Sequence, residues 1–575
     1  MMLDAAFPLH LDWDVLPGLP PALLFFAGAV LLVLLQGRQR LQQLVLILVP
    51  VLGILNLLSL ENGNQFTWQV LDFELVQLRV DRLSMLFGLL FHVGAIIGGI
   101  YALCVRDTSQ HAAALAYAGS ALGAVFAGDL ISLFFYWEGM AVASAFLVWA
   151  GRTQDSIGAG FRYLALHLLS GLLLLGGALI HYQATGDIAF DFIGAGTLAG
   201  GLILLAFGIK CGFPLFHGWI TDAYPRSTPS GTVFLSMFTT KVAVYALARG
   251  FPGTDILVPV GTVMAMFPIF YAVIENDLRR VLGYSMINQI GFMVVGVGIG
   301  TELALNGAVA HAFNEVLFKG LLFMTMGAVL FRVGNVLGSD IGGLYRSMPI
   351  TTVCCVVGAA SISAFPLFNG FVSKSMIMAA MIEEGHTLAW LGLLFASAGV
   401  FHHAGIKIPY FAFFGHDAGI RVAEAPRNML AAMCIAAVLC IFVGSYPAVL
   451  YGLLPWDAGY APYTYPHVIV QVQLLLFSAL AFAWLKLTGI YPPELRSVNV
   501  DADWLYRRLA PRALGGAAAG AGYASASFAR QWQGYGGRLR SGIEPLTRSL
   551  ATGTAALVVG VVLAGYLIPY YLSPW

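Results

Sequence analysis

A small set of ionisable residues lies inside long apolar runs of this chain. A charged side chain at the centre of a membrane helix costs roughly 2.5 to 3.5 kcal/mol, so such residues usually face a partner or a water-filled cavity. The candidates are Glu138, Lys210, Lys241, His311, Glu315, Lys319 and Lys374. Carboxylate, ammonium and imidazole groups can all take up and release protons. We therefore predict that these residues carry the chemistry of the protein and that this chemistry is proton transfer.

Three of these residues have a spacing that matches one face of a helix. His311, Glu315 and Lys319 stand four residues apart in AHAFNEVLFKGLLF. They would share one helical face and rise about 12 Å along it. One alternative is that Glu315 and Lys319 only satisfy each other, as charges at i and i+4 can. We favour a continuous polar line across the membrane, because the histidine extends it.

Lys210 and Lys374 lie beside segments that are expected to interrupt a helix. Pro214 follows Lys210, and Pro366 precedes Lys374. Proline lacks an N–H and leaves carbonyl groups of the preceding turn without partners, which water or an ammonium group can satisfy. Two interrupted helices in corresponding positions are typical of transporters built from repeats. For Lys374 the alternative is a side chain that reaches the membrane interface.

The composition indicates the class of protein that must position these residues. The 575 residues are 59% hydrophobic and only 10% charged, and the mean hydropathy is +0.82. A soluble domain carries about 25% charged residues. Lys plus Arg and Asp plus Glu both total 29, so no excess charge points to nucleic acid. We predict an all-α polytopic membrane protein.

The apolar runs predict about sixteen transmembrane helices, since about 20 residues cross the hydrocarbon layer. Their approximate positions are 20–36, 41–60, 83–104, 111–127, 130–149, 161–181, 191–210, 228–249, 254–273, 280–299, 303–331, 349–368, 388–411, 428–448, 468–488 and 552–572. The offset of five helices between the two interrupted helices suggests two five-helix repeats. We therefore divide the chain into N-terminal helices at 1–110, repeats at 111–249 and 254–411, additional helices at 412–488, a basic segment at 489–551 and a final helix at 552–575.

The arginines in the short loops predict an orientation. If Arg38 and Arg40 are cytoplasmic, alternation of the helices also places Arg152, Arg279 and Arg280 inside, in line with the positive-inside rule. The same rule makes the basic segment 489–551 cytoplasmic. Its aromatic and arginine residues suit a helix in the membrane interface, and a loose basic linker is an equal alternative.

Five motifs together resemble a known family. They are FYWEGM around Glu138, GIKCGFPLFHGWITDAYPRSTPSGTVFLSMFTTKVAVYALARG, ENDLRRVLGYSMINQIGF, AHAFNEVLFKGLLF and SISAFPLFNGFVSK. In this order, over roughly residues 80–415, they resemble the antiporter-like subunits of respiratory complex I and of Mrp-type multisubunit monovalent cation/proton antiporters, most of all the D-type Mrp subunits. The resemblance implies a fourteen-helix core with inverted repeats, a hydrated axis and proton translocation. It also implies a multi-pass location in a bacterial inner membrane, among other membrane subunits.

Carried over to this chain, the resemblance makes Glu138 the acidic partner of Lys210 and Lys374 the last lysine of the path. Lys241 and the three residues of AHAFNEVLFKGLLF would connect them. Many relatives have a second histidine where this chain has Glu315. At about 4 Å and an effective dielectric of 20, a Glu138–Lys210 pair would be worth about 4 kcal/mol. Separating such a pair could eject a proton toward Lys241.

Other features receive simpler interpretations. For His402, His403 and Lys407 we favour packing or hydrogen bonding over a place in the proton path. The chain contains no GxxxxGK, no GxGxxG after a strand and no HExxH, so we expect no nucleotide, flavin, haem or metal cofactor. The six cysteines form no CxxC pair, which argues against a thiolate metal site.

Three functions are compatible with these residues. The first is a proton-translocating subunit of a monovalent cation/proton antiporter complex, a transporter rather than an enzyme, with Na+ as the expected cation and lipid around it. The second is the same module coupled to a redox complex, such as complex I or a membrane hydrogenase, or to inorganic-carbon uptake. The third is an assembly scaffold that moves no ions. Neighbouring genes separate the first two, and neutralising the buried charges separates both from the scaffold.

Overall fold

The computed structural model describes residues 19–70, 73–457, 459–496, 499–513 and 515–516. Contacts divide the chain into two units, Met1–Ala502 and Asp503–Trp575. The described part of the second unit contains η4 (Leu505–Leu509). Arg507 of η4 pairs with Asp503, which precedes it, at 2.7 Å. The predicted helix at 552–572 and residues 517–551 of the predicted basic segment lie outside the described residues.

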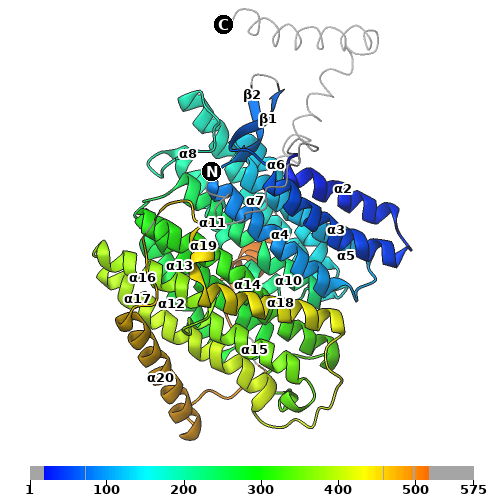
Figure 1. The fold of residues 1–575 in the computed structure, drawn as a ribbon, viewed down its shortest axis with the longest axis vertical. Helices are drawn as coiled ribbons and strands as arrows, with labels where there is room; N and C mark the ends of the chain where they lie inside the picture. The colour runs from blue at the N-terminus through cyan, green and yellow to red at the C-terminus, as the bar shows by residue number, and fades with distance from the viewer. Residues whose placement is uncertain (1–18, 71–72, 458, 497–498, 514, 517–575) are drawn as a thin grey trace, which may run out of the picture. The chain divides into compact units, whose positions relative to one another are not determined.

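The first unit consists almost entirely of helices (Figure 1). Its first half contains α2 (Pro21–Leu34), α3 (Gln39–Leu58), α4 (Arg82–Ala102), α5 (Thr108–Phe126), α6 (Leu130–Trp149), α7 (Gln154–Thr185), α8 (Leu198–Cys211), α9 (Gly218–Ala223), α10 (Pro229–Met237) and α11 (Thr239–Gly250). Its second half contains α12 (Leu257–Ile274), α13 (Leu278–Ile299), α14 (Glu302–Val333), η1 (Leu344–Arg346), α15 (Pro349–Ile362), α16 (Asn369–Glu383), α17 (Thr387–Val400), η2 (Phe401–Lys407), η3 (Tyr410–Phe414), α18 (Arg427–Ser445), α19 (Pro447–Tyr451) and α20 (Tyr465–Leu487).

Within the described residues, 11 helices are long and apolar enough to cross a membrane, and α2, α8 and α15 are shorter apolar helices. Every predicted apolar run between residues 20 and 488 overlaps a helix of the structure. The chain is therefore a polytopic helical protein, while the count of sixteen stays a prediction. The hydropathy pattern missed α16 as a separate helix, because its 15 residues, NGFVSKSMIMAAMIE, are shorter than a window of about 19 residues and include Asn369, Lys374 and Glu383.

The helix α14 lies at the centre of the first unit (Figure 1) and is buried over most of its length. It packs against α10, α13, α15, α16 and α18. Helices approach each other most closely where small residues meet. At the contact of α12 with α13, a Cβ on Gly291 would lie 2.5 Å from the amide nitrogen of Ala265, so glycine is required there. At the edge of the unit, α20 exposes most of its apolar side chains.

Two helix interruptions share a sequence and a backbone conformation. The break after α8 reads GFPLFHG and the break after α15 reads AFPLFNG. In each, the leucine after the proline has a positive φ, 73° at Leu215 and 75° at Leu367. A left-handed leucine costs on the order of 1 kcal/mol or more, so the surrounding packing must hold these bends. The prediction of interruptions beside Lys210 and Lys374 is confirmed.

One element departs from the all-α prediction. Residues Gly63–Val70 and Phe73–Val80 form β1 and β2, an antiparallel pair in which Gly63 faces Val80 and Val70 faces Phe73. The all-α prediction was wrong for this segment, because the bilayer excludes open strands only from backbone inside the hydrocarbon layer. The hairpin is attached to the helices through the amide of Val76, which donates to Asp129 at 2.7 Å.

Candidate functional site

Lys210 lies in the last turn of α8 and is fully buried. Its Nζ donates to the carbonyl oxygen of Trp137 at 2.5 Å and lies 4.3 Å from the centroid of the Trp137 ring. A cation over an indole ring is attracted by the π electrons, and the interruption after α8 leaves the lysine at a helix C-terminus, where positive charge is favoured. The ammonium group is thus held beside α6, next to Glu138.

Glu138 interacts electrostatically with Lys210, although the described residues contain no ion pair between them. Its Oε1 is buried and has no hydrogen-bond partner among the described residues. The side chain fits because α7 has a glycine opposite it: a Cβ on Gly171 would lie 1.5 Å from Oε1. An unpartnered carboxylate oxygen at this depth is costly, which is typical of a site that exchanges protons or water.

Lys241 and Glu315 form an ion pair of 2.8 Å, and both side chains are fully buried. Lys241 also donates to the carbonyl oxygen of Ser236 at 3.0 Å and to Thr240 Oγ1 at 3.2 Å. This carbonyl is available because the helix is interrupted at Phe238, between α10 and α11. The alternative of a local Glu315–Lys319 pair is wrong, since the Glu315 carboxylate contacts α11 instead.

The other charged residues of α14 reach two different neighbours. Lys319 donates to Ser285 Oγ on α13 at 2.7 Å. The two ring nitrogens of His311 lie 2.9 Å from Ser373 Oγ on α16 and 3.2 Å from Gln289 Oε1 on α13. The single helix α14 confirms the predicted shared face. The histidine and the lysine therefore connect α14 with α16 and with α13.

Lys374 follows Ser373 on α16 and is buried rather than extended to an interface. Its Nζ donates to the carbonyl oxygen of Ile362 at 2.8 Å, at the point where α15 ends. It also lies 5.0 Å from the centroid of the Phe292 ring. The contact of His311 with Ser373 Oγ thus brings the imidazole close to the neighbouring residue of α16, Lys374.

Charge balance within this group is unusual. Lys241, Lys319 and Lys374 all interact electrostatically with one buried carboxylate, that of Glu315. Burying an uncompensated ion costs several kcal/mol. The arrangement therefore favours states in which one or more of these lysines have released a proton.

A group of side chains between Lys210 and Lys241 was not predicted from the sequence. His167 on α7 is fully buried, stacks on Tyr163 with 4.0 Å between ring centroids and interacts electrostatically with Lys210. Neither of its ring nitrogens has a hydrogen-bond partner among the described residues. Beyond it, Tyr117 Oη lies 2.6 Å from Thr239 Oγ1. A histidine inside the run at 161–181 was a signal that the rule for intramembrane charges could have detected.

Two carboxylates that could have served as cation ligands have structural partners. Asp129 accepts hydrogen bonds from the amides of Ile131 and Ser132 at 2.9 and 2.7 Å and caps α6. Burial raises the pKa of Asp129, while these hydrogen bonds act in the opposite direction. Asp222 pairs with Arg162 at 2.7 Å and with Arg226. The described part of the chain contains no cluster of three or more His, Cys, Asp or Glu side chains suited to a metal ion.

The fold and this site define a class: a polytopic membrane protein whose interrupted helices surround a buried row of titratable side chains. Residues 127–401 match the family model described as NADH:quinone oxidoreductase/Mrp antiporter, transmembrane. This match covers less than half of the chain, and with the relatives it confirms the predicted resemblance to Mrp-type antiporter subunits and to complex I subunits.

Curated relatives come from several kinds of complex. The chain is 30% identical over 317 residues to a Na(+)/H(+) antiporter subunit of Alkalihalophilus pseudofirmus, and the match covers 51% of this chain and 64% of the relative. It is 26% identical over 421 residues to hydrogenase-4 component B of Escherichia coli, covering 65% of this chain and 62% of the relative. The chain spans only 40% to 64% of the length of such relatives.

Solved structures share the fold. A chain of the Mrp complex from Dietzia sp. superposes with a TM-score of 0.68 at 22% identity, covering 78% of this chain and 99% of that chain. A chain of the archaeal membrane-bound sulfane sulfur reductase superposes with a TM-score of 0.71 at 24% identity, covering 96% and 99%. Both structures are complexes by description, and the second is described as an archaeal respiratory membrane complex, so the fold of this chain is one found in such assemblies.

Proposed function

We propose that this chain is the proton-translocating subunit of a monovalent cation/proton antiporter complex, with Na+ as the exchanged cation. The observation that carries the proposal is the buried ion pair of Lys241 with Glu315, at 2.8 Å. It joins α11, the helix that follows the interruption at Phe238, to the central helix α14. A buried pair of this kind stabilises a protein little, but it can hold and release a proton when its partners separate.

The proposed path begins at Glu138 and Lys210 and continues to the Lys241–Glu315 pair. His167 and Tyr163 bridge the first interval, because they lie on α7 beside Lys210 and next to the hydroxyl groups that reach Thr239. Water between these groups would complete the hydrogen-bonded connection. In each step one N–H or O–H bond breaks and another forms, so that a proton moves while the net charge of the path is conserved.

From Glu315 the path continues along α14 to Lys319 and His311 and ends at Lys374. Ser373 links the last two groups, since its hydroxyl lies 2.9 Å from a ring nitrogen of His311. Histidine suits this position, because its ordinary pKa of about 6.5 allows exchange near neutral pH. The excess of lysines over carboxylates supports the same view, since a neutral lysine is available to accept each arriving proton.

We also propose that residues 111–249 and 254–411 are two five-helix repeats. The shared FPLF breaks, with their left-handed leucines, support this division. So do Asp129 and Asp277, which cap α6 and α13 and form isolated bridges with Ala189 and Leu337 ahead of α8 and α15. The same proposal divides the rest of the chain into segments at 1–110, 412–488, 489–551 and 552–575.

A second candidate is a proton-pumping antiporter-like subunit of a redox complex or of an inorganic-carbon uptake complex. The similarity to hydrogenase-4 component B favours it over a scaffold. In both proposals the chain works as a transporter with other membrane subunits, in a bacterial inner membrane. Copurification separates them: small antiporter subunits support the first candidate, and iron–sulfur or hydrogenase subunits support the second.

The experiment that tests the proposal is cation-dependent proton flux in inverted membrane vesicles that contain the intact complex. Lys210→Ala should abolish flux while the amount of complex in the membrane stays normal. Lys486→Ala is the matched control, because Lys486 is an exposed lysine on α20 and no member of the proposed path. Normal flux in the Lys210 variant would remove the proposal and favour a scaffold.

A further inference from the structure

A second buried ion pair between a lysine and a carboxylate lies outside the proposed path. Lys407, the last residue of η2, is fully buried, and its Nζ lies 3.0 Å from a carboxylate oxygen of Glu494. The same Nζ donates to the carbonyl oxygens of Val273 and Glu275, at 2.7 and 2.6 Å, at the end of α12. A third carbonyl oxygen, that of Ala272, lies 3.2 Å from this Nζ. Four acceptors therefore share the three hydrogens of the ammonium group, and Glu494 competes with the carbonyl groups for them.

The surroundings of Lys407 repeat those of Lys241. Residues 407–412 read KIPYFA and residues 241–246 read KVAVYA. Each lysine lies at an irregular point of a helix, the interruption at Phe238 in one case and the π-helix η2 in the other. π-turns are frequent at functional sites. Each lysine also meets one buried carboxylate from a distant part of the chain, at 2.8 Å for Lys241 and 3.0 Å for Lys407.

His403 lies between the proposed path and this second pair. It stands four residues before Lys407, is fully buried and interacts electrostatically with both Lys319 and Lys407. Neither ring nitrogen has a hydrogen-bond partner of good geometry among the described residues, although the Gly399 carbonyl lies beside the ring. Since an unsatisfied buried polar group is costly, a role in exchange explains this imidazole better than packing does. Its neighbour His402 instead packs against Phe482.

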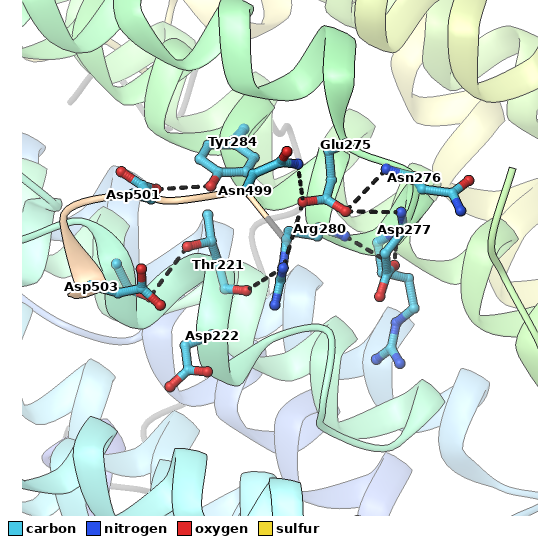
Figure 2. Close-up of polar contacts among 12 residues, drawn as sticks. Thr221, Asp222, Glu275, Asn276, Asp277, Arg280, Tyr284, Asn499, Asp501 and Asp503 are labelled. Carbon is cyan, nitrogen blue, oxygen red and sulfur yellow. Dashed lines mark hydrogen bonds and ion pairs between the residues drawn. The ribbon is translucent and has the colours of Figure 1, made fainter. Parts of the chain in front are cut away.

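Glu494 lies in the segment that follows α20, of which residues 488–496 and 499–502 are described. This segment covers the C-terminal end of α12 and the N-terminal end of α13. In this segment Asn499 donates to Glu275 at 3.3 Å, and Asp501 accepts from Tyr284 at 2.8 Å (Figure 2). Burial raises the pKa of Glu494, and the charge of Lys407 partly offsets this rise. Two residues further on, Arg496 is 71% exposed. The Glu494 carboxylate therefore lies close to the boundary between the buried interior and the surface.

We infer that His403, Lys407 and Glu494 form a second branch of the proton path, which leaves it at Lys319 and ends at the segment around Glu494. The inference rests on the proposed function. The Lys407 ammonium gives a proton to the Glu494 carboxylate, and the resulting carboxylic acid releases it to water at the surface. The Lys407 amine regains a proton from the His403 imidazolium, which has received one from the Lys319 ammonium. Each transfer breaks one N–H or O–H bond and forms one, and reversal of the steps carries a proton inward.

Proton flux in vesicles with the intact complex tests this branch. Because the route through His311 to Lys374 stays open, Glu494→Gln should remove only the part of the flux that leaves through this branch, and Glu494→Asp, which keeps a positioned acid–base group, should retain most of it. Arg496→Gln is the matched control on the same segment, since its exposed pair with Asp340, at 2.6 Å, is not part of the branch. Flux is divided by the amount of complex in the membrane for every variant.

A double variant separates a proton branch from a structural pair. Replacing both members of a buried ion pair by apolar residues is often neutral for stability. Lys407→Met combined with Glu494→Met should therefore assemble but keep the same reduced flux as Glu494→Gln if the branch carries protons. Restored flux in the double variant, or normal flux in Glu494→Gln while Lys210→Ala is inactive, would overturn the branch and leave the main path standing. Normal flux in Lys210→Ala would instead overturn the proposed function itself.

Discussion

The ion pair between Lys241 and Glu315 gives the sharpest prediction for stability. At 2.8 Å and an effective dielectric of 20, the two charges attract each other by about 6 kcal/mol. Most of this gain is offset by the desolvation of both groups. Glu315→Gln removes one partner and leaves Lys241 buried without a counter-charge, which typically costs about 3–5 kcal/mol. Release of the lysine proton limits the loss, so we expect the lower end of this range.

Thermal unfolding of the purified complex measures this effect, and proton flux in vesicles measures its functional consequence. Glu315→Gln should lower the unfolding temperature and abolish flux. Adding Lys241→Met should restore stability without restoring flux, because the pair is then absent on both sides. Glu383→Gln on α16 is the control, since Glu383 is exposed. The reasoning is refuted if Glu315→Gln matches the control in both assays, or if the double variant transports protons.

Two further predictions concern Glu138, where the proposed path begins, and the stability of the fold. Gly171→Ala should displace the Glu138 carboxylate and reduce flux at least tenfold, whereas Gly176→Ala on the same helix, where a Cβ would meet open space, should transport normally; equal flux would contradict the close contact. Burial by itself raises the pKa of Asp81, but Arg249 and the hydrogen bonds of the α4 N-terminus outweigh it and lower the pKa. The ionised carboxylate therefore stabilises the fold above its unfolded pKa of about 3.9, and this stabilisation is lost as the pH falls through the lower folded pKa. Asp81→Asn should lower the unfolding temperature at neutral pH, with a difference that disappears in acid; a difference that persists there would exclude this titration.

The helices could be predicted from the sequence because a helix that crosses the membrane needs about 20 consecutive apolar residues. The interrupted helices could also be predicted, since proline and glycine change the backbone geometry locally. The hairpin at 63–80 was not detected, because its alternation of polar and apolar residues disappears when hydropathy is averaged over a membrane-length window. The helix α16 was missed for a related reason, since its polar residues Asn369, Ser373 and Lys374 are buried inside the protein and lower the averaged hydropathy.

The candidate residues of the site could be predicted because a charge inside an apolar run needs a partner or water. Their pairing could not. The helical spacing of Glu315 and Lys319 left a local pair open as the alternative to a continuous polar line, whereas in the fold Glu315 pairs with Lys241 on another helix. Likewise, no local pattern relates Lys407 to Glu494, because their contact depends on how the segment after α20 returns to the helices. Tertiary packing, rather than sequence spacing, decides which charge faces which.

An experimental density map of the intact complex, at a resolution that reveals ordered water, tests the central claim most directly. The account predicts water molecules that connect Lys210 with Lys241 and Lys319 with Lys374, in contact with His167 and His311. Dry, close-packed side chains between these lysines would contradict it, because protons cannot cross an apolar gap of several ångströms without a hydrogen-bonded carrier.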